Sequence, residues 1–339
     1  MSDARMETLA RNLVRDSVRA QPGEKVLIEV RGVYIPLVNA LVREVYAAGA
    51  LPFVSLKEPA IDRELMRGCL KEQLQLLFDW EKERTLAMDC YIGVRIPQNS
   101  FETTGLPFEQ IELFNTVYDR RITNEVRVPH TRWVALRYPT PAMAQSAGMN
   151  SDDFEDFYFQ VCNMDYRRMS RAMDPLKALM ERTDQVHIVS PGTDLRFSIK
   201  DCGVVKCDGS CNIPDGEVYS APVRDSVEGV ITYNTPSLVD GFTFENIRLE
   251  FSQGKIVDAA SNDSKRLNQI LDTDNGARYV GEFAFGVNPY IVRVMNDTLF
   301  DEKICGSIHF TPGNCVMGCH NGNCSQVHWD IVLIQTPEY

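Results

Sequence analysis

The sequence predicts an α/β fold of two domains: an N-terminal α/β domain with a mainly parallel sheet over residues 1–184, and a β-rich C-terminal domain over residues 185–339. Two observations predict this division. In the first part, short apolar runs alternate with segments of helical periodicity, which is typical of parallel strands joined by helices. In the second part, apolar and polar residues alternate between turn-forming residues, which is typical of antiparallel strands. A length of 339 residues suffices for two domains that each bury a core.

The elements of the first domain are expected in alternating order. Residues 9–18 and 37–45 carry apolar side chains at helical spacing, and Gly49 follows the second of these helices. Compact apolar runs predict four strands, at residues 25–30, 51–56, 88–96 and 133–137. The turn after the first strand lacks the glycine pattern of a dinucleotide-binding loop, so no dinucleotide site is expected there.

A helical segment precedes the second domain. Residues 151–182 are expected to form a helix that bridges the domains and breaks at Asp174-Pro175, because a proline removes one helical hydrogen bond. Beyond it, alternating apolar residues predict strands at 186–189, 195–199, 247–251 and 255–257, with a turn at Gln253-Gly254 between the last two. A single helix around residues 267–271 interrupts these strands.

Composition excludes several classes of function. A formal net charge of -12 argues against a protein that binds nucleic acid, which would need a basic surface facing the phosphates. No apolar run has the length that a membrane span needs, and the N-terminus lacks an apolar leader. We therefore expect a cytoplasmic protein without membrane partners, whose ten cysteines are reduced thiols.

The chemistry-bearing residues gather near the C-terminus. Three of the five histidines lie at 309, 320 and 328, and the segment His328-Trp329-Asp330 places an imidazole and a carboxylate on one face of a strand. Such a pair is half of a site for a divalent metal. An aspartate that only orients the imidazole would produce the same spacing, so the tripeptide alone leaves both interpretations open.

Two further acids occupy unusual positions. Glu217 ends the turn-rich run Asn-Ile-Pro-Asp-Gly-Glu, and Glu282 is a lone acid in the apolar run Gly-Glu-Phe-Ala-Phe-Gly. A buried acid is costly unless it is paired, hydrogen-bonded or metal-bound. Each acid alone has an ordinary explanation as a solvated side chain, but both strengthen the metal hypothesis.

Several sequence blocks, in order, resemble the M29 family of metalloaminopeptidases, the aminopeptidase T and aminopeptidase S type. The resemblance covers nearly the whole chain, because the blocks at 138–148 and 191–195 also fit. The blocks of the second domain that carry it lie at residues 212–217, 281–289, 300–304, 307–313 and 327–330.

The resemblance implies that the β-rich domain is a metal-binding domain. It implies two divalent metal ions (Zn, Co or Mn), a short peptide as substrate and a homodimer. Glu282 would bridge the ions and serve as the catalytic residue, whereas Glu302 matches a further acid near the metals. The implied ligands in full are Glu217, Glu282, Glu302, His309, His328 and Asp330.

The chain also departs from the family pattern. Val316 stands where relatives of this type carry a tyrosine that is thought to stabilise the oxyanion, and a lost donor of that kind typically costs about 100- to 1000-fold in turnover. A second hypothesis is a mononuclear Fe(II) ring-cleaving dioxygenase held by His309, His328 and Asp330. A third is a relative that keeps the ligands but is catalytically weakened or inactive.

Four cysteines fall close together near the histidines: Cys305, Cys315, Cys319 and Cys324. Their spacing matches no standard zinc or iron–sulfur motif. They are interpreted as inert reduced thiols, with a soft-metal site and a redox-sensitive loop as the alternatives.

Overall fold

A computed structural model of the chain describes residues 3–99, 101–239 and 242–335. It has two compact units: unit 1 consists of Met1–Met164 and Gly209–Pro214, and unit 2 of Asp165–Asp208 and Asp215–Tyr339. The predicted α/β class is confirmed, with parallel strands in unit 1 and antiparallel strands in unit 2. Compactness groups residues 165–184 with unit 2, and the domain boundary expected after residue 184 stays a prediction.

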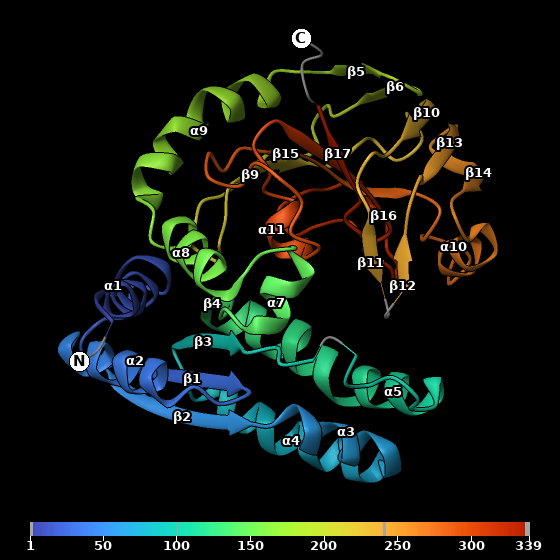
Figure 1. The fold of residues 1–339 in the computed structure, drawn as a ribbon. Coiled ribbons are helices and arrows are strands. Elements are labelled where there is room, and N and C mark those ends of the chain that lie inside the picture. Colours follow the sequence, from blue (N-terminus) through green and yellow to red (C-terminus); the bar gives the residue numbers. More distant parts are fainter. Residues whose placement is uncertain (1–2, 100, 240–241, 336–339) are drawn as a thin grey trace. The chain divides into compact units, whose positions relative to one another are not determined.

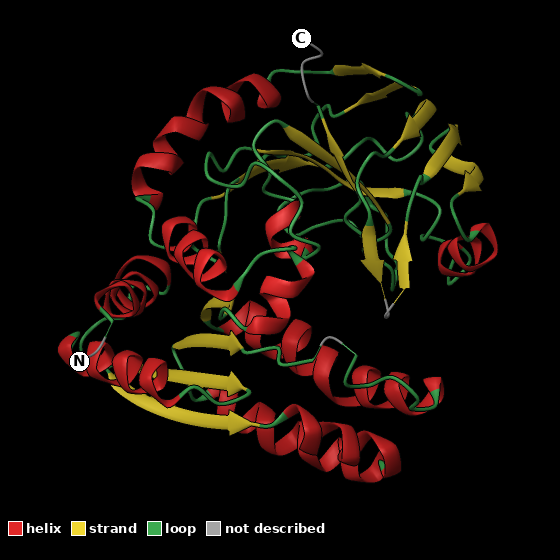
Figure 2. Ribbon diagram, in the orientation of Figure 1, coloured by secondary structure: helices red, strands yellow, loops and turns green. Residues whose placement is uncertain are grey.

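The sheet of unit 1 has the strand order β2-β1-β3-β4-β8, and every neighbouring pair in it is parallel. Its first four strands are those that the sequence predicts, and Figure 2 shows β1, β2 and β3 as yellow arrows side by side. The strands are β1 (Lys25–Arg31), β2 (Leu51–Lys57), β3 (Cys90–Arg95), β4 (Arg132–Arg137) and β8 (Asn212–Ile213).

Helices surround this sheet. Helix α2 follows the first predicted strand, contacts β1 and β2, and ends before Gly49, whose φ of 77° lies in the left-handed region that glycine tolerates. The helices and π-helical segments are α1 (Ala4–Asn12), η1 (Leu13–Ser17), α2 (Ile35–Ala47), α3 (Pro59–Gly68), α4 (Lys71–Leu86), α5 (Phe108–Phe114), η2 (Asn115–Asp119), η3 (Ile122–Arg127), α6 (Val128–His130), α7 (Pro141–Ser146) and α8 (Ser151–Cys162).

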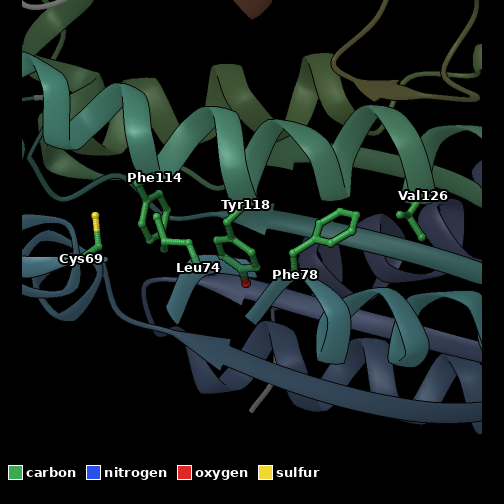
Figure 3. Close-up of a cluster of buried hydrophobic side chains, with 6 residues drawn as sticks. All are labelled: Cys69, Leu74, Phe78, Phe114, Tyr118 and Val126. Carbon is green, nitrogen blue, oxygen red and sulfur yellow. The ribbon is translucent and has the colours of Figure 1, made fainter. Parts of the chain in front are cut away.

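A cluster of buried side chains joins α4 to the helical segments that follow β3. Figure 3 shows Leu74 and Phe78 of α4 facing Phe114, Tyr118 and Val126. Phe114 and Tyr118 meet edge to face, with ring centroids 5.4 Å apart. The cluster buries the apolar side of α4 and leaves its other side to solvent.

Replacing Phe78 by alanine should lower the free energy of unfolding by about 3–5 kcal/mol, because it empties a buried aromatic position. Leu76 lies on the same helix but is 52% exposed, so Leu76→Ala should change stability by less than about 0.5 kcal/mol. Urea denaturation of both variants measures the difference. Equal losses would contradict the assigned packing of α4.

Unit 2 contains three antiparallel sheets, with strand orders β14-β13-β10-β6-β5, β11-β12 and β17-β16-β15-β9-β7. Among the described residues, no helix is both long and apolar enough to cross a membrane. The strands of unit 2 are β5 (Gln185–Ser190), β6 (Thr193–Ser198), β7 (Val205–Cys207), β9 (Glu217–Ser220), β10 (Glu228–Thr232), β11 (Ser237–Val239), β12 (Phe242–Phe244), β13 (Arg248–Ser252), β14 (Lys255–Ala260), β15 (Val280–Gly286), β16 (Ser307–Pro312) and β17 (Val332–Ile334).

The helices of unit 2 are α9 (Tyr166–Glu181), α10 (Ser264–Leu271) and α11 (Thr298–Asp301). The helix break expected at Pro175 is wrong, because α9 runs through that proline. The break lies earlier, where Asn163 ends α8 and the Asp165 side chain accepts from the Arg168 N–H to begin α9. These capping contacts, rather than the proline, set the end of one helix and the start of the next.

Aromatic packing fixes the sheet that carries the predicted ligands. The Phe197 ring on β6 lies with its centroid 4.9 Å from those of both Phe283 on β15 and Phe310 on β16. All three side chains are buried. Because side chains alternate along a strand, the neighbours of Phe283 and Phe310 point to the opposite face of this sheet. Figure 1 shows β9, β15, β16 and β17 as one continuous layer.

Candidate metal centre

The face opposite these aromatic rings gathers polar residues from three adjacent strands. Ala284 of β15 pairs with His309 on β16 and with Tyr219 on β9, while Gly286 pairs with Glu217. Glu282, two residues before Ala284, lies on the same face, and it is only 3% exposed. The antiparallel register therefore brings together residues that are far apart in the sequence.

Gly286 allows a fourth segment to lie directly on this sheet. A Cβ atom at Gly286 would be 2.3 Å from the Ile304 carbonyl oxygen and 2.5 Å from Ser307 Oγ. Any larger residue would push the Glu302–Ser307 segment away. Glycine at this position thus positions Glu302 beside the ligand-bearing strands.

Two histidines face the two oxygens of one carboxylate. Glu282 Oε1 lies 3.3 Å from His309 Nε2, and Glu282 Oε2 lies 3.3 Å from His328 Nε2. His309 Nε2 is also 3.4 Å from Glu217 Oε2. On the other side, His328 Nε2 is 3.4 Å from Asp330 Oδ1. Glu282 therefore belongs to two groups of side chains at once.

These separations fit metal ligands better than hydrogen-bonded pairs. A charge-assisted N–H···O bond measures about 2.7–2.9 Å. Two ligands bound at about 2.0–2.2 Å to one tetrahedral ion lie about 3.4 Å apart. Buried Glu217 Oε2 also lacks a hydrogen-bond donor among the residues that the structure describes. The donor set thus fits two ions that share Glu282.

Two groups of ligand atoms meet this description. Glu217, Glu282 and His309 form one, Glu282, His328 and Asp330 the other, and the ligand atoms of each group lie within 4.8 Å of one another. Five of the six expected ligands therefore come together, whereas Glu302 belongs to neither group. The assignment of these residues as ligands stays a prediction.

Neighbouring groups orient the ligands of the second group. His328 Nδ1 lies 3.1 Å from the Asn314 carbonyl oxygen, to which it donates, and this leaves Nε2 free to face the carboxylates. Thr311 Oγ1 donates to Asp330 Oδ1 over 2.8 Å. The expected strand at 327–331 is present only as an isolated bridge from His328 to Gly313, since β17 begins at Val332. Trp329 is nevertheless buried and the His328 side chain is 36% exposed, as the alternation predicted.

The sequence analysis missed a buried lysine beside the ligands. Lys303 is fully buried, and its Nζ lies 2.6 Å from Glu302 Oε1, 2.7 Å from Glu217 Oε1 and 3.7 Å from Asp215 Oδ1. A buried ammonium group is stable only when acids surround it. The run Asp301-Glu302-Lys303 next to apolar residues was the one available sign of such a cluster.

Lys303 also explains a third group of potential ligands. Cys207, Asp215 and Glu217 come within the same 4.8 Å limit, but the ammonium group of Lys303 already lies 2.7 Å from Glu217 Oε1 and 3.7 Å from Asp215 Oδ1. Burial, together with the charges of Glu217 and Asp215, raises the pKa of the Cys207 thiol well above its usual value. A lysine cation in this position makes the group a poorer metal site than the two groups that share Glu282.

Burial and neighbouring charges shift the proton affinities of the ligands. Burial lowers the pKa of His309, but Glu282 and Glu217 outweigh it and raise that pKa to about 9. At His328, burial again lowers the pKa, but the charges of Asp330 and Glu282 outweigh it and raise that pKa to about 10. Burial raises the pKa of Glu282, yet both imidazoles hold that pKa far below its usual value. Burial raises the pKa of Glu302 to about 8 against the opposing charge of Lys303.

The clustered cysteines lie beside this centre without joining it. Cys315 and Val316 pack with Tyr219 against buried Cys319, and all these thiols are free. Burial raises the pKa of Cys319 to about 12, so the thiol stays protonated. None of the potential ligand groups in the described part of the chain includes Cys305, Cys315, Cys319 or Cys324. Of the three interpretations, inert thiols fit these observations best.

Histidines and carboxylates that face one shared acid on a β-sheet have the donor types found in metal-dependent hydrolases. The family model described as thermophilic metalloprotease (M29) matches residues 2–338. The chain belongs to this family, and it is a hydrolase of the metalloaminopeptidase type.

Relatives and solved structures agree with this placement. Aminopeptidase T of Thermus thermophilus is 26% identical over 97% of this chain and 92% of its own length. Aminopeptidase PepS of Streptococcus thermophilus is 22% identical over 88% of this chain and 81% of its own.

Two solved structures share the fold. The wild-type AmpT structure from Thermus thermophilus has a TM-score of 0.82 at 23% identity, over 96% of this chain and 92% of that one. The 2,5-dihydroxypyridine dioxygenase of Pseudomonas putida KT2440 has a TM-score of 0.61 at 14% identity, over 98% of this chain and 92% of that one.

Replacing Lys303 by methionine should destabilise the metal-free protein by about 3–5 kcal/mol, because Glu217 and Glu302 would remain buried without a cation. Lys177 pairs with Glu181 on the surface of α9, and Lys177→Met should cost less than about 1 kcal/mol. Chemical denaturation with chelator present measures both. A Lys303→Met protein as stable as the wild type would contradict the proposed charge balance.

The stability of the metal-free protein should fall as the pH rises. The pKa values of His309 and His328 are raised from 6.5 to about 9 and 10, so their contribution is complete below pH 6.5 and is lost as the pH passes through 9 and 10. Thermal unfolding in chelator between pH 6 and 10 tests this. His309→Asn and His328→Asn should flatten the dependence, whereas His320→Asn, in the adjoining loop, should leave it unchanged.

Proposed function

We propose that the chain removes the N-terminal residue of short peptides at a centre of two divalent metal ions. The proposed ligands are Glu217, Glu282, His309, His328 and Asp330. The observation that supports this best is that the two oxygens of Glu282 face two different histidines at 3.3 Å. A site for one ion would need neither the second oxygen of Glu282 nor Glu217.

Two ions at this centre would lower the pKa of a bound water and polarise the carbonyl oxygen of the scissile peptide bond. Glu282 has the proposed catalytic role because its deprotonated carboxylate holds both halves of the centre together. The two ions would also hold the neutral α-amine of a peptide beside the polarised carbonyl, which orients the scissile bond. The aromatic packing behind the sheet excludes water from its far side.

Imidazole and carboxylate donors without a thiolate suit Zn, Co or Mn, and we propose one of these as the metal. Glu302 has a different proposed role from the one expected: its Oε1, 2.6 Å from Lys303 Nζ, holds that side chain in place and does not bind an ion. Short peptides as substrates and assembly as a homodimer remain proposals that follow from the family. The cytoplasmic location stays a prediction.

The metal content and the activity should change together. Wild-type protein should bind about two ions per chain and release the N-terminal amino acid from a chromogenic amide, and a chelator should abolish the release. His328→Asn should retain about one ion, and Glu282→Gln should lose both and at least about 100-fold in kcat. Glu245→Gln, which changes an exposed acid, is the control and should keep both properties.

The outcomes separate the three hypotheses. One iron per chain with oxygen consumption on an aromatic diol, and no amide hydrolysis, would support the dioxygenase. Two bound ions per chain, with no hydrolysis of the amide after loading with Zn, Co or Mn, would support an inactive relative. Either result would overturn the proposed aminopeptidase activity.

A further inference from the structure

Two chemically different sets of side chains lie near the predicted ligands. Lys303 and Glu302 are charged and largely buried. The other set is an apolar surface of three partly exposed side chains, which we call the apolar wall: Tyr219, Cys315 and Val316. These side chains pack on a fully buried base that contains Ala221 and Cys319. The wall is therefore built on the core and still reaches the surface.

The wall is directly adjacent to the centre. Tyr219 lies two residues after Glu217 on the same face of β9, and it pairs with Ala284, whose partner on the other side is His309. The Val316 N–H lies 3.4 Å from the carbonyl oxygen of Gly281, the residue before Glu282. Tyr219 and Val316 are thus held by the strands that carry the ligands.

A hydrogen bond fixes the orientation of Tyr219. Its hydroxyl donates to the Met317 carbonyl oxygen over 2.8 Å, which ties β9 to the loop after β16. Because the hydroxyl already has an acceptor, the ring presents mainly carbon atoms. Its cross-strand neighbours are Ala284 on β15 and Val205 on β7, and the small Ala284 side chain covers little of the ring on that side.

We propose that Tyr219, Cys315 and Val316 receive the side chain of the substrate's N-terminal residue and select apolar and aromatic side chains. This inference rests on the proposed function. A peptide whose α-amine is held at the centre must place its first side chain beside the centre. Lys303 is buried and offers no surface to a substrate, whereas the wall offers carbon contacts that a Leu or Phe side chain fills.

Charged N-terminal residues meet a penalty at the same wall. A Lys side chain would lose water against the wall without gaining a charged partner from Tyr219, Cys315 or Val316. A Glu side chain would meet the same loss of water, because the wall offers it no positively charged partner. The wall therefore discriminates by desolvation, and preference for apolar residues follows.

The test compares substrates and ligands that differ only in the first side chain. The p-nitroanilides of Leu, Phe, Lys and Glu give kcat/KM, and the matching amino acid hydroxamates give binding constants by calorimetry with the metal-loaded protein. Leu and Phe should exceed Lys and Glu by about 10- to 200-fold in both measurements. Far-ultraviolet circular dichroism and metal content check that each variant is folded and loaded.

Variants locate the preference in the wall. Tyr219→Ser and Val316→Ser should each lower the Leu-to-Lys ratio about tenfold, while Tyr219→Phe, which keeps the ring, should preserve it. Val257→Ser changes an exposed valine of β14 and is the control. The ratio, rather than kcat alone, distinguishes selection from a general loss of structure.

Each outcome decides between the two proposals. Hydrolysis of all four substrates at similar rates, or an unchanged ratio in both serine variants, would overturn the wall and leave the aminopeptidase intact. If no amide is hydrolysed, the aminopeptidase proposal fails, and the hydroxamates still test the wall. Equal binding of the Leu and Lys hydroxamates would then reject it.

Discussion

The placement of one carboxylate in the middle of a buried strand is the constraint on which the second unit depends. Glu282 is almost fully buried in β15, directly before Phe283, whose ring packs on Phe197 of β6 on the other face of the sheet. An acid in such surroundings needs compensation on both of its oxygens. His309 and His328 supply it from β16 and from the segment before β17, so strand register, loop course and ligand geometry all follow from this one side chain.

Further charged side chains lie around Glu282 and its two histidines. Glu217 and Asp330 face the histidines from outside, and Lys303 balances the acids on one flank. Next to these charged groups lie the apolar side chains of Tyr219 and Val316. In the proposed selection, they would receive the first side chain of a peptide while the centre holds its α-amine.

Much of the fold was predictable because the pattern of neighbouring residues indicates each of these helices and strands. The alternation of strands and helices over residues 25–57 gave β1, α2 and β2 from apolar periodicity alone, with Gly49 as the end signal. The prediction at Pro175 was wrong because a proline lowers the stability of a helix without deciding its end. The caps of α8 and α9 at Asn163 and Asp165 decided it.

By itself the sequence determined the fold class, the first four strands of the parallel sheet and the types of residue able to bind a metal. The full set Glu217, Glu282, His309, His328 and Asp330 came from the resemblance to the M29 family. The sequence left the tripeptide from His328 to Asp330 open between a hydrogen-bonded pair and half a metal site. Only the tertiary structure gathered the five side chains into two groups that share Glu282, added Lys303 to balance Glu302, and set Tyr219 beside them. The reason is physical: periodicity reports which face of a strand is buried, but cross-strand register decides which distant side chains meet.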